Sequence, residues 1–265
     1  MVQARAHTAS EPDDADTDNR LIWAVFFFVL AVYAKFPAVD LIVSSRYFDA
    51  ARGFVHAQDP LVLWLYDWTP PLGRGLALLA ALLALLSPLI AKLLRAAGRL
   101  DAAQRCQGPW RHASIVFLCA ALLGPGLVIE GVFKNTVGRP RPVQIEQFGG
   151  NQAFQGPFAL GDNPDAHRSF CSSHAAAGFA LMGLGLTCGP TWRRRWFLIG
   201  LVSGAVIGAG RIMQGGHFLS DVVFAFYAVW LSCELVAWID RRRTRRGQPP
   251  PSRPHRPLDV TDDAP

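Results

Sequence analysis

The sequence predicts an all-α, multi-pass (polytopic) membrane protein built as one bundle of six transmembrane helices. Three observations favour this fold class. Apolar residues make up 51% of the 265-residue chain. Charged residues make up only 17%, whereas soluble domains carry roughly 25%. The charged residues collect at the chain ends and between long apolar runs, as in a chain that crosses a membrane repeatedly.

Each predicted span approaches the roughly 20 apolar residues that cross a hydrocarbon layer about 30 Å thick. The first span follows a polar, acidic stretch instead of a short basic one, and no A-x-A cleavage site comes after it. We therefore expect a retained helix there and not a cleaved signal peptide. In chain order we expect the spans at 21–39, 72–94, 113–133, 174–188 (a short one), 196–213 and 221–239.

Lys and Arg residues set the predicted orientation. They concentrate in segments 92–111, 193–195 and 241–246, which all fall on one side of a six-span chain. Because positively charged loops face the cytoplasm, both termini are expected to be cytoplasmic. We expect 1–20 to be a disordered cytoplasmic N-terminus, 21–240 the membrane domain, and 241–265 a basic, Pro-rich cytoplasmic tail.

The net charge of +6 does not indicate nucleic-acid binding, because the basic residues flank apolar runs and form no stripe with interleaved aromatics. The five cysteines have no paired spacing and no CxxC, so neither a disulfide framework nor a zinc site is predicted. No obligate protein partner is evident, and the bilayer itself is the expected environment.

Three polar clusters lie on the predicted outer face, in segments that join the spans: 134–142, 169–174 and 211–221. Their cations sit on the side where the charge bias disfavours them. Snorkelling or lipid-headgroup contact would explain any single basic run, but three such runs favour an anionic ligand, with phosphate the obvious candidate. Glu130 lies four residues before Lys134, so the two form either an ion pair that orients the lysine or a plain helix-end salt bridge.

These clusters contain the parts that phosphate-ester cleavage requires: a nucleophile, a proton donor and fixed positive charge. His217 and Asp221 are four residues apart and share a helix face. The carboxylate can therefore orient one ring nitrogen and leave the other to attack phosphorus. His174, at the mouth of another helix, is placed to protonate the leaving oxygen.

The same clusters resemble the signature of the type 2 phosphatidic acid phosphatase superfamily, K-x6-R-P, P-S-G-H and S-R-x5-H-x3-D. The first matches as Lys134 and Arg141-Pro142, and the third as Arg211, His217 and Asp221. The second is degenerate, because Cys171 replaces proline and Ser173 replaces glycine. In the third motif Gly210 replaces serine. The resemblance covers about residues 113–240.

This resemblance implies a helical bundle of that superfamily's type and a metal-independent, cofactor-free phosphatase. His217 would be the nucleophile that becomes phosphohistidine, Asp221 would orient it, and His174 would be the general acid. The phosphoryl group would be held by Lys134, Arg141, Ser172, Ser173 (through backbone N–H near it) and Arg211.

Segments 40–49 and 214–221 look like those of bacterial lipid A phosphatases, and the 4′-phosphatase branch is favoured. The resemblance implies a phospholipid or lipid A substrate and an active site on the periplasmic face of a bacterial inner membrane. Undecaprenyl diphosphate and phosphatidylglycerophosphate stay open as substrates. A lipid phosphotransferase and a transporter for anionic lipids stay open as functions.

Overall fold

The computed structural model describes residues 14–161, 163 and 165–246. The predicted all-α architecture is confirmed, and the two-residue strands β1 (Phe48–Asp49) and β2 (Gly53–Phe54) add a small antiparallel hairpin. The α-helices are α1 Asp14–Lys35, α2 Val39–Ser45, α3 Pro60–Ala96, α4 Leu100–Arg105, α5 Arg111–Ala121, α6 Lys134–Thr136, α7 Ser173–Phe179, α8 Pro190–Met213 and α9 Leu219–Arg246. The π-helical segments η1 (Cys106–Trp110) and η2 (Leu122–Phe133) and the 3-10 turns η3 (Pro142–Gln144), η4 (Glu146–Phe148) and η5 (Ala180–Gly185) complete the list.

Several helices end where the sequence did not predict. α1 stops at Lys35, because Pro37 follows, and the chain bends by 87° into α2. α3 begins at Pro60 and runs for 37 residues through Pro70 and Pro71, so the helix extends beyond the predicted span 72–94 at both ends. The ends 14–20 and 241–246, predicted to lie outside the membrane domain, continue α1 and α9. The rest of the predicted N-terminus and tail lies outside the described residues.

Among the described residues, four helices are long and apolar enough to cross a bilayer, or five if the bent α1–α2 pair counts as one span. This supports a multi-pass membrane protein. The four are α3, the continuous helix Leu100–Thr136, α8 and α9. The predicted span at 174–188 is instead α7 followed by η5, about 22 Å in length. Six spans therefore stay a prediction. A helix this short is possible here because α7 packs against α3, η2, α8 and α9 and is largely buried by them.

Glycines allow α7 and α8 to approach closely. A side chain on Gly178 would lie 2.7 Å from the backbone of Gly204, and one on Gly204 would lie 2.1 Å from the ring of Phe179. Small residues commonly allow such close packing between lipid-embedded helices. The contact fixes the start of α7, which carries His174, relative to α8, which carries Arg211.

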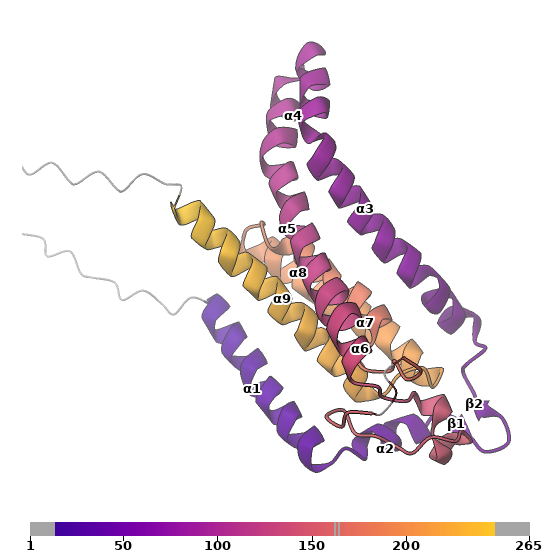
Figure 1. Ribbon diagram of the computed structural model, residues 1–265. Helices are drawn as coiled ribbons and strands as arrows, with labels where there is room; N and C mark the ends of the chain where they lie inside the picture. The colour runs from indigo at the N-terminus through magenta and orange to yellow at the C-terminus, as the bar shows by residue number, and fades with distance from the viewer. Residues whose placement is uncertain (1–13, 162, 164, 247–265) are drawn as a thin grey trace, which may run out of the picture.

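The connections that carry the polar clusters meet at one end of the bundle. Figure 1 shows α2, the β1–β2 hairpin and the start of α9 at that end, whereas the α3–α4 turn and the last turns of α9 lie at the opposite end. A small apolar cluster of Phe54, Ile145, Phe148 and Phe218 holds these connections together. Residues distant in sequence are thereby brought to one surface of the molecule.

Candidate active site

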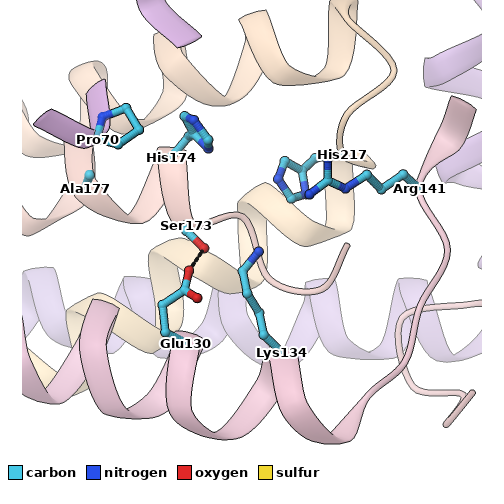
Figure 2. Close-up of a pocket in the computed structure, with 8 residues that line it drawn as sticks. All are labelled: Pro70, Glu130, Lys134, Arg141, Ser173, His174, Ala177 and His217. Carbon is cyan, nitrogen blue, oxygen red and sulfur yellow. Dashed lines mark hydrogen bonds between the residues drawn. The ribbon is translucent and has the colours of Figure 1, made fainter. Parts of the chain in front are cut away.

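A cavity of about 230 Å³ lies at this end of the bundle. Figure 2 shows the side chains around it, which come from α3, η2, α6, α7 and the loops that follow α6 and α8. Five predicted site residues therefore surround one space: two from the first cluster, two from the second and one from the third. The lining residues are Pro70, Glu130, Lys134, Arg141, Ser173, His174, Ala177 and His217.

Asp221 lies behind this cavity and is fully buried. Its Oδ1 accepts a hydrogen bond from Arg139 Nη1 at 2.6 Å. Its Oδ2 accepts from Ser169 Oγ at 2.6 Å and from the backbone N–H of Phe218 at 2.8 Å. Because both oxygens are engaged on several sides, the carboxylate is held in one position.

His217 lies between Asp221 and the cavity and is 1% exposed. Its Nδ1 is 3.5 Å from Asp221 Oδ2, an ion-pair distance that is long for a hydrogen bond. Burial lowers the pKa of His217 to about 3, with repulsion from Arg211 and Lys134 adding to it and Asp221 opposing it. The ring is therefore neutral at pH 7, and a neutral imidazole has a lone pair with which to attack an electrophile.

Arg139 and Asp40 were not predicted as site residues. Arg139 is fully buried, and besides Asp221 it donates to Asp40 Oδ2 at 2.8 Å and to Ser220 Oγ at 2.8 Å. Its guanidinium also lies 4.2 Å from the centroid of the Phe218 ring. Asp40 in α2 is buried too and accepts from the backbone N–H of Ser220 at 2.9 Å. Arg139 lies in the polar cluster 134–142 and Asp40 begins the segment 40–49, but nothing in the sequence indicated that the two side chains meet.

Tyr66 of α3 is a third residue that was not predicted to belong to the site. Its ring stacks on the His174 imidazole, with centroids 4.9 Å apart and planes inclined by 18°. The Arg211 guanidinium lies 4.5 Å from the same ring centroid. Tyr66 therefore links two predicted site residues from different helices. In the sequence it was one of several aromatics in a segment typical of a membrane interface.

The expected ion pair between Glu130 and Lys134 is absent among the hydrogen bonds and salt bridges of the described residues. Lys134 Nζ instead donates to the backbone carbonyl of Arg168 at 3.1 Å. Glu130 accepts a hydrogen bond from the Ser173 hydroxyl, drawn as a dashed line in Figure 2.

Two predicted phosphate ligands do not line the cavity. Ser172 is fully buried and caps α7, its Oγ accepting from the backbone N–H of Ala175 at 3.4 Å. Arg211 is 6% exposed and hydrogen bonds to Gln214. The Arg141 side chain, in contrast, points toward His217 in Figure 2. Within the part of the chain that the structure describes, no three His, Cys, Asp or Glu side chains are grouped to hold a metal ion.

Comparison with known proteins agrees with this arrangement. Residues 113–245 match the family model described as PAP2 superfamily. The proteins named lipid A 4′-phosphatase from Francisella tularensis subsp. novicida (strain U112) and from Rhizobium leguminosarum are 40% and 35% identical over 126 and 122 residues. Each alignment covers 46% of this chain and 56% or 50% of the relative, so the match spans about half the length of these proteins.

A third protein of that name, from Rhizobium etli (strain ATCC 51251), is 36% identical over 123 residues, 46% of each chain. No solved structure matches. The family match includes the segments that contribute Lys134, Arg141, His174, His217 and Asp221, the residues on which the resemblance was based. The predicted family is thus confirmed, and this chain belongs to the PAP2 superfamily.

Proposed function

We propose that the protein is a lipid phosphatase that hydrolyses a phosphate monoester on a membrane lipid, with lipid A as the preferred substrate. The observation that carries this proposal is the meeting of His217, His174, Lys134 and Arg141 at one cavity, with a fixed carboxylate behind His217. The lipid A assignment is supported by the names of the three relatives.

The reaction has two steps. First, Nε2 of His217 attacks phosphorus, the P–N bond forms, the bond to the leaving oxygen breaks, and His174 gives that oxygen a proton. Lys134 and Arg141 neutralise charge on the phosphoryl oxygens. Asp221, fixed by Arg139 and Ser169, stabilises the positive charge that the ring acquires. Second, water attacks phosphorus, His174 takes its proton, and the P–N bond breaks to release phosphate.

Ser172 and Arg211 act indirectly in this scheme. Ser172 orders the start of α7 as its cap, and Arg211 places a positive charge beside Tyr66 and the two histidines. Ser173 contributes its backbone N–H at the first turn of α7, because its hydroxyl is engaged by Glu130.

We expect purified protein to release inorganic phosphate from lipid A faster than from phosphatidylglycerophosphate, phosphatidic acid or undecaprenyl diphosphate. His217→Gln should lower turnover by at least about 10³-fold, because the nucleophile is lost. His56→Gln is the matched control, since His56 is only partly buried, does not line the cavity and pairs with Asp59. Near-normal turnover in H217Q would refute the mechanism. Label transferred to a second lipid would indicate a phosphotransferase, and lipid movement without phosphate release a transporter.

We further propose that no metal ion takes part, because Lys134 and Arg141 supply the charge neutralisation that a divalent ion provides in metal-dependent phosphatases. EDTA should leave the rate on detergent-dispersed substrate unchanged. Vanadate should inhibit, because it adopts the five-coordinate geometry of phosphoryl transfer. A large loss of rate with EDTA that a divalent ion restores would show that a metal site exists.

We propose that the site faces the periplasm of a bacterial inner membrane. The basic segments 92–111 and 241–246 lie at the end of the bundle opposite the cavity, which supports this orientation (Figure 1). Ala159→Cys, made in a chain whose exposed Cys119 and Cys188 are replaced by serine, should react with an impermeant thiol reagent on intact spheroplasts.

Gln104→Cys, in an exposed position at the opposite end, is the control and should react only after lysis. The reverse pattern of labelling would overturn the proposed orientation.

A further inference from the structure

We propose that Glu130 selects substrates whose phosphate is carried by a group rich in hydrogen-bond donors, namely a sugar with hydroxyl or amide groups beside the phosphate. It would discriminate against phosphate carried directly on diacylglycerol. This inference rests on the proposed function, because it assigns a specificity to the same cavity.

Glu130 is the one acidic residue among the described residues that line the cavity. The other ionisable side chains of the lining are cations and imidazoles. Glu130 lies one helical turn before Lys134, and 48% of its side chain is exposed. A carboxylate near the end of an apolar helix is costly, and in such helices ionisable groups usually mark functional sites. Next to a bound phosphate the cost is greater, because like charges repel in a medium of low dielectric constant.

The contacts within the protein satisfy only part of this carboxylate. Oε1 accepts the hydrogen bond from Ser173. Oε2 is 3.7 Å from Arg168 Nη2, in a half-exposed pair that is too long for a hydrogen bond and contributes little to stability. Among the described residues Oε2 has no hydrogen-bond donor, and a carboxylate can accept about four hydrogen bonds.

The position of Glu130 suggests what the missing donor is. Phosphate held by Lys134, Arg141 and His217 would place its ester oxygen toward His174, the proton donor. Ser173, which holds Glu130, is the neighbour of His174 in the sequence, and both line the cavity. Glu130 therefore faces the carrier of the phosphate, where a sugar offers O–H and N–H donors. The glycerol of phosphatidic acid is esterified and offers none.

A purely structural role for Glu130 makes a different prediction. If the carboxylate only ordered Ser173 or Lys134, its removal would lower the rate on every substrate in proportion. If it acted only through its charge, its removal would raise the rate on every phosphate monoester. A role in selectivity predicts changes of opposite sign for the two kinds of substrate.

The test compares Glu130→Gln with the unmodified protein. Glutamine keeps the volume and an acceptor for Ser173 but removes the charge. Phosphate release is measured from a lipid-linked glucosamine phosphate and from phosphatidic acid in the same detergent. We expect kcat/KM for the glycolipid to fall about tenfold, since a charge-assisted hydrogen bond is weakened. The value for phosphatidic acid should rise, because repulsion is relieved.

Glu146→Gln is the matched control, because Glu146 is an exposed carboxylate of the neighbouring loop that does not line the cavity; both values should stay within about twofold. Equal falls, equal rises or no change in E130Q would each overturn the inference while leaving the proposed function intact. Failure of the unmodified protein to release phosphate from either lipid would overturn both.

Discussion

The buried ion pair between Arg139 and Asp221 is the contact on which the rest of the site depends. It joins the loop after α6 to the start of α9, and Asp40 and Ser169 extend it to two further segments of the chain. A buried charge is tolerated only when it is paired and hydrogen bonded, and each charge here has several partners. The same contacts therefore close this end of the bundle and fix the carboxylate behind His217.

Electrostatics in the cavity follows from this arrangement. Asp221 is neutralised by Arg139, so in the proposed reaction it would orient His217 without presenting a free negative charge to the phosphate. His217 stays neutral because it is buried, which keeps it nucleophilic. The remaining cations, Lys134 and Arg141, line the cavity and attract an anion. Glu130 is the one acidic residue in the described lining of the cavity. We therefore proposed that a hydrogen-bond donor of the substrate binds its carboxylate.

The sequence predicted features that depend on local spacing, and it did not predict those that depend on contacts between residues distant in the chain. Spacing within motifs is local, so Lys134, His174 and His217 could be found from the chain alone, and apolar runs indicated the spanning helices. Asp40 and Tyr66 act through contacts with residues more than 90 positions away, which no spacing rule reveals. The predicted span begins after Pro70 and Pro71, residues that commonly end a helix, yet α3 continues through them and starts at Pro60.

The proposed reaction requires that His217 becomes covalently phosphorylated. The most direct measurement is a rapid denaturing quench of the protein during turnover of a lipid with labelled phosphate, followed by mapping of the protein-bound label. We expect an acid-labile, base-stable phosphoramidate on the peptide that contains His217, and its label should chase into inorganic phosphate. Label on a serine or an aspartate, or single-turnover hydrolysis with no protein-bound label at any time, would contradict it.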